Sequence, residues 1–171
     1  MGVVIVLGLL LRAVNINQSL WLDEATSVLT ARDLSFSDIL IKFSPGDFHP
    51  PLYYLMLKVW VGIFGAGEVG ARSMSVLFGL ATIPVVFLIG RQLFDRKVGL
   101  MAAFFLATAP LHIYYSQEAR MYVPAAFFAV LFVWFFLKNS LPGLIISGLF
   151  LIYTDYLPVF LIFTFAAFLI I

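Results

Sequence analysis

The stretch that decides the fold is Ser73–Phe94, SMSVLFGLATIPVVFLIGRQLF, in which no charged side chain occurs before Arg91. A bilayer core about 30 Å thick requires about 20 predominantly apolar residues of α-helix, and this stretch supplies them. The rest of the chain has the same bias, since 63% of its 171 residues are hydrophobic and only 11% are charged. Soluble domains are about 25% charged. The sequence therefore predicts an integral membrane protein.

Further apolar runs lie on both sides of this stretch. They are Gly2–Val14, Val98–Tyr115, Val123–Leu137, Leu141–Tyr153 and Pro158–Ile171. We expect each run to form a spanning helix, so the predicted fold class is all-α, a polytopic transmembrane bundle of about six spans. The first run is not expected to be a signal peptide, because no basic region precedes it and no small-residue cleavage site follows it. Because the chain starts and stops inside apolar sequence, residues 1–171 are expected to be part of a longer protein.

The run Pro51–Gly65, PLYYLMLKVWVGIFG, is too short to span. As a helix it would reach only about 22 Å. It also carries Lys58 at its centre, where a charge costs about 2.5–3.5 kcal/mol in a bilayer. Its tyrosines and tryptophan suit the headgroup layer, so we expect an interfacial helix over about 52–64. That helix would close a large external loop, residues 15–72.

Two shorter elements are expected earlier in this external loop. The segment Glu24–Leu34 is helix-like, and Ser37-Asp38 is placed to cap a second short amphipathic helix, ILIKF. The segment SPGDFHPP, which follows, is rich in turn-forming residues and leads into the interfacial helix.

The loop charges support this topology. If Pro51–Gly65 does not span, the basic segments RQLFDRK (91–97) and KNSLPG (138–143) share one side, which the positive-inside rule makes cytoplasmic. The remaining polar groups then share the external side. They are Asp23, Glu24, Asp47, His49, Glu68, Arg72, Glu118, Arg120 and Asp155. If the short run spanned instead, these groups would be divided between the two faces.

The composition excludes several classes of site. Cysteine is absent, so the chain has no disulfide, no thiolate metal site and no cysteine nucleophile. The net charge is only +1 and no basic stretch is interleaved with aromatic residues, so nucleic acid is not an expected partner. A divalent metal stays open as a cofactor, because the external side offers a histidine and several acids without the spacing of a known motif.

Asp23 and Glu24 are the first candidate catalytic residues. Adjacent residues on a helix point about 100° apart, so the two carboxylates cannot both face one reacting atom and must serve different roles. One alternative is structural, with Asp23 as an N-cap and Glu24 as a first-turn acid favoured by the helix dipole. The other is functional, because the pair follows the first apolar run and Trp21, where a cavity at the membrane surface would open.

The candidate ligand-binding residues are a histidine and two arginines. His49 precedes two prolines that fix its backbone, so it is either a positioned phosphate or metal ligand or a surface histidine at a helix start. Arg120 lies in the polar island YYSQEARMY, residues 114–122, where it either anchors to lipid phosphates or binds a substrate phosphate through its planar fork. Arg72 is a similar candidate. Glu118 and Tyr122, which flank Arg120, complete the predicted substrate site.

An external acid cluster with nearby cations on a membrane-embedded body suits transfer of a group from a lipid phosphate to an acceptor. A transporter or lipid flippase is one alternative, and it predicts charged or broken helices near the bilayer midplane. A non-catalytic membrane scaffold is another.

The order of motifs resembles the N-terminal part of polytopic glycosyltransferases with the type C fold. The motifs are W-L-D-E-A (21–25), F-H-P-P-L-Y-Y (48–54), F-G-x-G-E-x-x-A-R (64–72), G-R-x-L-F (90–94) and Y-S-Q-E-A-R-M-Y (115–122). Within that group the chain is most similar to the protein O-mannosyltransferase and aminoarabinose-transferase superfamily, and the similarity covers nearly the whole chain.

This resemblance implies an inverting transfer from a polyprenyl-phosphate sugar to a glycan, lipid or protein acceptor at the periplasmic or lumenal face. It implies that Asp23 activates the acceptor and Glu24 supports the site. His49 would lie near the donor phosphate, with Arg72 and Arg120 facing the same cavity. Aminoarabinose-type relatives carry Glu-Lys where this chain has Phe48-His49, so the identity of the donor sugar does not carry over.

Overall fold

The computed structural model describes residues 1–170, with side chains through Ala167, and this part of the chain is all-helical, as the sequence predicts. The helices are α1 (Gly2–Ala13), α2 (Leu22–Asp33), α3 (Phe36–Asp38), the π-helical turn η1 (Ile39–Phe43), the 3-10 turn η2 (Ser44–Gly46), α4 (Leu52–Phe64), α5 (Glu68–Leu93), α6 (Arg96–Thr108), α7 (Pro110–Ser116), α8 (Tyr122–Leu137), α9 (Leu141–Thr154) and α10 (Val159–Ile170).

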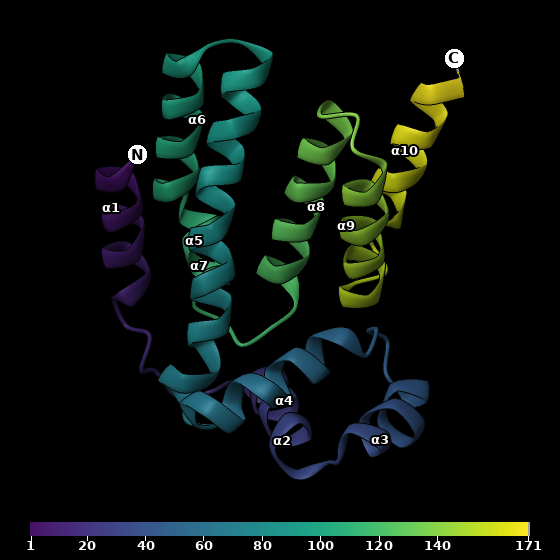
Figure 1. Ribbon diagram of the computed structural model, residues 1–171. Coiled ribbons are helices and arrows are strands. Elements are labelled where there is room, and N and C mark those ends of the chain that lie inside the picture. The colour runs from purple at the N-terminus through teal and green to yellow at the C-terminus, as the bar shows by residue number, and fades with distance from the viewer. Residues whose placement is uncertain (171) are drawn as a thin grey trace.

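The long helices run side by side, and a layer of shorter helices crosses one end of them (Figure 1). α1, α6 and α7 lie on one side of α5, whereas α8, α9 and α10 lie on the other. α5 packs against both α6 and α8, so it joins the two groups. The crossing layer consists of α2, α3 and α4.

Helix lengths partly test the predicted spans. α5 is long and apolar enough to cross a membrane alone, and α6 with α7 would pass as one span bent by 58°. The helices α1, α4, α8 and α9 are apolar but shorter, so the number of six spans stays a prediction. The last expected span, Pro158–Ile171, extends to a residue outside the described part of the chain.

A break divides the run expected over Val98–Tyr115. The run bends at Ala109, whose extended backbone (φ −64°, ψ 118°) separates α6 from α7. The cause is Pro110, because a proline pushes the preceding residue out of the helical region. The unbroken span expected here is therefore corrected to two helices at an angle.

α4 lies across the end of the bundle instead of alongside α5 (Figure 1). Lys58 points away from the long helices, since its Nζ donates to the carbonyl oxygen of Ala31 in α2 at 3.2 Å. Trp60 holds the other face, where its Nε1 donates to the carbonyl oxygen of Gly70 at 3.1 Å and to Oγ of Ser73 at 2.9 Å. The sequence argument for an interfacial helix rested on this lysine and on the helix length. In the structure one face of α4 contacts α2 through Lys58, and the other contacts α5 through Trp60.

The segment between α2 and α4 differs from its prediction in one detail. The cap is Ser35, whose Oγ accepts from the backbone N–H of Asp38 at 3.1 Å. The predicted cap at Ser37-Asp38 is therefore wrong, and ILIKF forms the single π-helical turn η1 instead of an amphipathic α-helix. A capping serine oxygen accepts from the N–H three residues later in the chain. Because that N–H belongs to Asp38, the cap is Ser35, the residue before the short helix α3.

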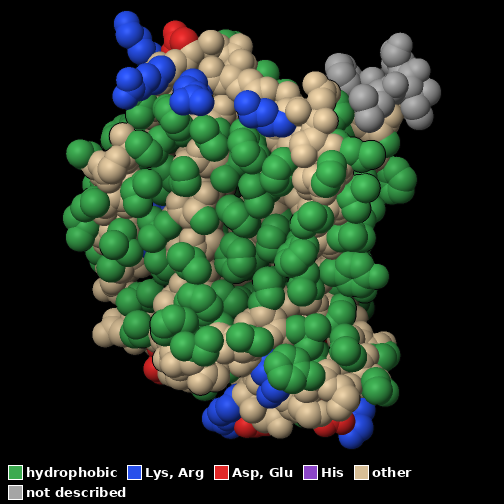
Figure 2. All heavy atoms as spheres, viewed as in Figure 1, with side chains coloured by type: hydrophobic (Ala, Val, Ile, Leu, Met, Phe, Trp, Pro, Cys, Tyr) green, Lys and Arg blue, Asp and Glu red, His purple; other side chains and the backbone are tan. Residues whose placement is uncertain are grey.

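Charges collect at the two ends of the molecule (Figure 2). Hydrophobic side chains cover the middle of the visible face, a basic group lies at the end where α5 turns into α6, and mixed charges lie at the end with the crossing helices. The residues of the α5–α6 turn, from Arg91 to Lys97, are exposed. This arrangement suits a membrane bundle whose polar ends reach water.

Glycines set the close approach of α5 and α6. A Cβ atom on Gly90 would lie 2.8 Å from Cα of Gly99, and one on Gly99 would lie 2.6 Å from the carbonyl oxygen of Phe87. Both contacts are with backbone, which cannot rotate away. Any larger residue must therefore separate the two helices.

We predict that Gly99→Ala lowers the free energy of unfolding by about 1–3 kcal/mol, the usual cost of overpacking a tight contact. The matched control is Gly62→Ala in α4, where an added Cβ meets no atom within 4 Å. There the helix propensity of alanine favours folding by up to about 1 kcal/mol. Equilibrium unfolding of detergent-purified protein, followed by circular dichroism, measures both. Equal stability of the two variants would contradict the prediction.

Candidate functional site

A buried ion pair joins the crossing helices to the bundle. Nε of Arg72 in α5 donates to Oε1 of Glu24 in α2 at 2.9 Å, and Nη2 donates to Oε2 at 2.6 Å. Glu24 is fully buried, and the side chain of Arg72 is only 6% exposed. Such two-point pairs are among the stronger polar contacts in proteins. Because either charge would be costly to bury alone, the two residues act as a unit.

Arg72 uses all of its N–H donors within the protein. Besides the two bonds to Glu24, Nη1 donates to the carbonyl oxygens of Ile16, at 2.9 Å, and Gln18, and Nη2 donates to that of Ser19, at 3.3 Å. A guanidinium carries five N–H groups, so this geometry leaves none for a phosphate. Arg72 instead fixes the backbone of the linker, residues 14–21, which connects α1 to α2.

Glu24 also accepts two backbone hydrogen bonds. Its Oε1 accepts from the N–H of Ala119 at 2.7 Å, and its Oε2 accepts from the N–H of Trp21 at 3.3 Å. The second bond caps the start of α2, which begins at Leu22. The alternative in which Asp23 is the N-cap is therefore wrong, because the capping acid is Glu24.

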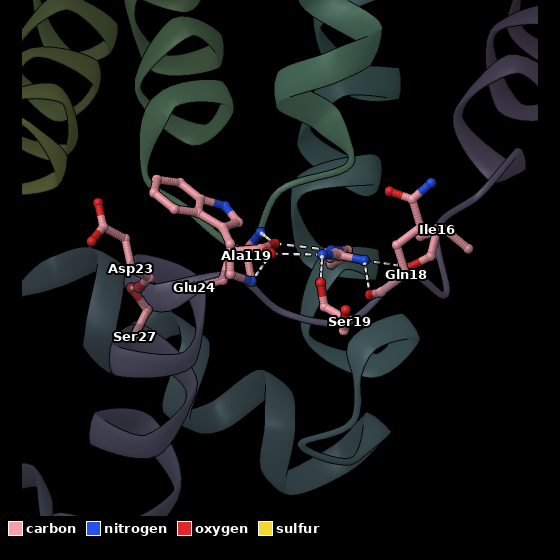
Figure 3. A network of polar contacts seen from close by, with 9 residues as sticks. Ile16, Gln18, Ser19, Asp23, Glu24, Ser27 and Ala119 are labelled. Carbon is pink, nitrogen blue, oxygen red and sulfur yellow. Dashed lines mark hydrogen bonds and ion pairs between the residues drawn. The ribbon is translucent and has the colours of Figure 1, made fainter.

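Asp23 lies on the other side of this cluster (Figure 3). The picture places Asp23 and Ser27 on one side of Glu24, and Gln18 and Ser19 on the other. Asp23 and Glu24 diverge because neighbouring residues on a helix point about 100° apart. The side chain of Asp23 is 46% exposed, whereas that of Glu24 is fully buried. The two carboxylates therefore have different surroundings, as the sequence indicates.

Asp23 lines a cavity of about 410 Å³, here called the Asp23 cavity. The volume falls within the roughly 300–1,000 Å³ typical of small-molecule sites. Its other polar side chains come from α2, from the segment around η1 and η2, from α4 and from the loop before α8. They are Thr26, Lys42, Asp47, His49, Tyr54 and Arg120. The cavity thus brings together three of the predicted site residues, Asp23, His49 and Arg120.

Arg120 is buried but keeps unused donor capacity. Its Nη1 donates to the carbonyl oxygen of Asp23 at 3.3 Å and to Oγ of Ser27 at 3.1 Å, while Nη2 lies 3.9 Å from Oδ2 of Asp23. The ring of Tyr122, another predicted site residue, lies 5.7 Å from Cζ of Arg120, so Tyr122 lies beside the guanidinium and not in the cavity lining. Nε has no hydrogen-bond partner among the described residues. Arg120 therefore differs from Arg72 in having an N–H left to offer.

Asp47 fixes the segment that carries His49. Nδ1 of His49 lies 3.5 Å from Oδ1 of Asp47, and the hydroxyl of Tyr54 donates to Oδ2 of the same carboxylate. Burial, together with the bond to Asp47, raises the pKa of Tyr54 above its usual value near 10. Tyr54 consequently stays a neutral donor at physiological pH. It ties His49 and Asp47 to α4 at the edge of the Asp23 cavity.

Glu118 and Arg72 line a second cavity instead of the first. This cavity, of about 580 Å³, lies between the linker and the end of α7, and is here called the linker cavity. Glu118 is 6% exposed, and its Oε2 has no hydrogen-bond partner within the described part of the chain. Burial raises the pKa of the Glu118 carboxyl above its usual 4.5. The single site expected from the sequence is thus divided into two cavities.

Sequence reasoning missed the residues that hold α1 in place. Arg12 is fully buried, and it donates to Oγ of Ser116 at 3.1 Å, to Nδ1 of His112 at 2.8 Å and to two backbone carbonyls. Nε2 of Gln117 donates to the carbonyl oxygens of residues 11, 12 and 14, which end α1 without helical partners. The available signal was the arginine inside the first apolar run. It resembles a snorkelling residue when the position of α7 is unknown.

The described residues contain no group of three or more histidine, aspartate or glutamate side chains placed to hold a metal ion. Within the Asp23 cavity, Asp47 already accepts from Tyr54 and from the N–H of Phe48 at 2.8 Å. The cavity therefore offers hydrogen-bonding and cationic groups as its main chemistry.

Comparison with known proteins identifies one match. Residues 48–171 match the family described as dolichyl-phosphate-mannose-protein mannosyltransferase. The match includes His49, Arg72, Glu118 and Arg120, and it begins after α2, so Asp23 and Glu24 lie outside it. No curated protein and no solved structure matches the chain.

We predict that Glu24→Ala lowers the free energy of unfolding by about 3–5 kcal/mol, because it leaves the guanidinium of Arg72 buried without its partner. Asp23→Asn is the matched control on the neighbouring residue. Its carboxylate is 46% exposed and lies 3.9 Å from Nη2 of Arg120, beyond hydrogen-bond distance, so loss of its charge should cost only about 0–1 kcal/mol. Chemical denaturation in detergent measures the difference between the two variants. A Glu24→Ala protein as stable as Asp23→Asn would contradict the structural role of the pair.

We also predict a pH-dependent effect of Glu118→Gln. The raised pKa of Glu118 means that the folded chain holds this proton more tightly than the unfolded chain, so stability falls as pH rises from about 4.5 through the folded-state value. The hydrogen bond with Tyr114 and the charges of Arg120 and Arg72 lower the pKa of Glu118 and so oppose this effect, whereas the charge of Glu24 adds to it. Glu118→Gln should therefore gain stability relative to wild type at pH 7 and lose that gain near pH 4.

Melting temperatures across this pH range measure the effect. The control is Glu68→Gln in the first turn of α5, where loss of an acid favoured by the helix dipole predicts destabilisation at pH 7. A Glu118→Gln protein that is less stable than wild type at pH 7 would contradict the prediction.

Proposed function

The chain belongs to the dolichyl-phosphate-mannose-protein mannosyltransferase family and is a membrane glycosyltransferase of the type C fold, and from this premise we propose that it transfers a sugar from a polyprenyl-phosphate donor. The acceptor is a glycan, lipid or protein, and the reaction takes place in the Asp23 cavity. The crossing helices α2–α4 then lie on the extracytoplasmic side, opposite the basic α5–α6 turn.

The observation that carries the proposal is the pairing of unlike groups in the Asp23 cavity. Asp23 presents a half-exposed carboxylate, and Arg120 lies 3.9 Å away with a buried N–H that lacks a partner among the described residues. A base beside a cation with spare donors suits a reaction in which one group takes a proton while the other receives a leaving phosphate. His49 lines the same cavity and adds a second group that can donate to an anion.

The proposed step is a single displacement. The acceptor hydroxyl gives its proton to the Asp23 carboxylate while its oxygen bonds to the anomeric carbon of the donor sugar. The bond between that carbon and the phosphate oxygen breaks, and the electron pair leaves on polyprenyl phosphate. Arg120 and His49 stabilise the negative charge that develops there. Because the displacement occurs once, the configuration at the anomeric carbon is inverted.

Glu24 and Arg72 serve this step as positioning residues. Glu24 accepts from the N–H of Ala119, so it fixes the backbone next to Arg120. Arg72 holds Glu24 in turn and has no donor left for a phosphate. We therefore assign the phosphate contact to Arg120 and His49 alone, and this replaces the direct role expected for Arg72. Tyr122 supports Arg120 through its ring.

A transporter or flippase is the second candidate, and one observation favours it. The break between α6 and α7, together with the buried Arg12, matches the broken and charged helices expected of transporters. Arg12 is nevertheless engaged by Ser116, His112 and two carbonyls, so it ties helices together instead of facing an open path. The glycosyltransferase proposal explains more of the chain.

We predict that Asp23→Asn binds a polyprenyl-phosphate sugar as wild type does but turns it over about 10²–10⁴-fold more slowly, the usual contribution of a general base. Arg120→Gln should instead weaken donor binding by about tenfold or more, because it removes a charge-assisted hydrogen bond. The measurement uses the detergent-purified full-length protein with a panel of radiolabelled donors, and it follows binding and release of polyprenyl phosphate separately.

Asp33→Asn is the matched control. Asp33 ends the same helix as Asp23, its carboxylate is exposed, and it pairs with Arg32 on the surface. This variant should leave both binding and turnover unchanged. Turnover by Asp23→Asn at the wild-type rate would overturn its assignment as the base. Movement of donor across vesicle membranes without release of polyprenyl phosphate would favour the flippase instead.

A further inference from the structure

The linker cavity has no role in the step described above. It is enclosed by the linker on one side and by the end of α7 on the other, and Glu24 and Arg72 form the wall toward the crossing helices. The Asp23 cavity lies on the opposite side of this pair, as the positions of Asp23 and Gln18 around Glu24 show (Figure 3). The linker cavity, with about 580 Å³, is the larger of the two, since the Asp23 cavity has about 410 Å³. It can therefore hold a ligand group separate from the phosphate.

The lining of the linker cavity is polar but offers no free cation. Asn15 and Gln18 contribute side-chain amides, Ser19 a hydroxyl and Glu118 a carboxyl. Arg72 is the one cation among the described lining residues, and its five N–H groups are all used by Glu24 and the linker backbone. This chemistry does not suit a phosphate. Amide, hydroxyl and carboxyl groups together match the alternating donors and acceptors of sugar hydroxyls.

Glu118 indicates that a ligand donor belongs in this cavity. Glu118 is only 6% exposed. The hydroxyl of Tyr114, in the same lining, is hydrogen-bonded to the Glu118 carboxyl group, but Oε2 of Glu118 has no hydrogen-bond partner among the described residues. Leaving a buried carboxyl oxygen without a donor costs free energy, so native structures rarely keep one without a reason. A ligand hydroxyl that donates to Oε2 would supply the missing bond. Trp21 lines the same cavity and adds an aromatic surface.

We propose that the linker cavity is a carbohydrate subsite, in which Glu118 and the amide of Gln18 bind the hydroxyls of a sugar unit. The assignment rests on the proposed glycosyltransferase function, because it supplies a place for a sugar that the phosphate site does not. The sugar belongs either to the acceptor glycan or to the donor, since both present the same hydroxyl chemistry. The cavity recognises it without contact to phosphate.

The linker is built so that this subsite can exist. Arg72 and Gln117 hold the linker and the end of α1 through backbone carbonyls, including those of Gln18, Ser19 and Val14. The side chains of Gln18 and Ser19 are not needed for those bonds. They therefore stay available to a ligand while the backbone is fixed.

The test separates sugar binding from phosphate binding in the full-length protein. The probes are methyl glycosides of hexoses and pentoses, which lack phosphate, and geranylgeranyl phosphate, which lacks a sugar. The protein is purified in a zwitterionic detergent, because maltoside and glucoside detergents carry the very headgroup being tested. Saturation-transfer NMR detects glycoside binding, and titration calorimetry gives both dissociation constants.

We expect Glu118→Gln and Gln18→Ala to weaken glycoside binding by about five- to tenfold, the effect of losing one good hydrogen bond, with no change for geranylgeranyl phosphate. Gln18→Ala keeps the backbone carbonyl that Arg72 binds. Asn17→Ala is the matched control, since Asn17 is exposed in the same linker and does not line the cavity. It should change neither constant. Arg120→Gln should weaken only the phosphate probe.

A native polyprenyl-phosphate sugar distinguishes the two sources. If Glu118→Gln weakens this donor more than it weakens geranylgeranyl phosphate, the subsite binds the donor sugar. If it weakens only the free glycosides, the subsite binds the acceptor. Either result supports the carbohydrate assignment.

Several outcomes overturn it. Glycoside binding that is absent, that is unchanged in Glu118→Gln and Gln18→Ala, or that is equally weakened in Asn17→Ala removes the subsite. Binding of methylammonium that depends on Glu118, in place of glycoside, makes it a cation site. In each of these cases the proposed function stands if geranylgeranyl phosphate still binds in an Arg120-dependent way. It fails separately if that binding is absent.

Discussion

The arrangement of the external side depends on the ion pair between Glu24 and Arg72. It joins α2, α5, the linker and the loop between α7 and α8. A buried ion pair stabilises a fold only when its geometry is good and its remaining donors and acceptors are satisfied. Here Arg72 has a partner for each of its N–H groups, and each carboxylate oxygen of Glu24 also accepts from a backbone N–H. The pair therefore binds five backbone groups, those of Ile16, Gln18, Ser19, Trp21 and Ala119, which no apolar contact of the same size could do.

This position gives the neighbours of the pair their chemistry. Asp23 precedes Glu24 by one residue, and the helical step turns it toward the other cavity, while Arg120 follows directly after the residue whose N–H Glu24 binds. Asp23 and Arg120 are thus each one residue away from a residue of the anchored network, Glu24 and Ala119 respectively. A group next to a fixed backbone keeps its location while its side chain stays free to meet a ligand. Such separation between anchoring and reacting residues is what precise positioning of substrates requires.

The features that could be predicted from the sequence are those that depend on the length of apolar runs and on helical periodicity. The all-helical class and the short α4 with Lys58 at its centre follow from apolar run lengths, and the different roles of Asp23 and Glu24 follow from the helical step. It could not separate Arg72 from Arg120, because both lie at helix ends among polar residues. Only the tertiary fold brings three linker carbonyls to one arginine and leaves a donor of the other unpaired. The bend before Pro110 was readable in principle, because a proline disfavours the helical conformation of the residue before it, whereas the contact of Arg12 in α1 with Ser116 in α7 was not.

The manner in which the linker is held also bears on how such a site can change. Arg72 and Gln117 bind carbonyl oxygens, which every residue type provides, so substitutions in the linker side chains leave those bonds in place. The side chains of Gln18 and Ser19 can therefore vary without loss of the fold, whereas Arg72 and Glu24 cannot. Asn15 is constrained as well, because its φ of 59° lies in the left-handed region that favours asparagine or glycine. Side chains that are free of structural duty are the ones through which ligand preference can be altered at little cost in stability. Substitutions are therefore tolerated at Gln18 and Ser19, whose side chains line the cavity, whereas Glu24 and Arg72 must be kept for the fold.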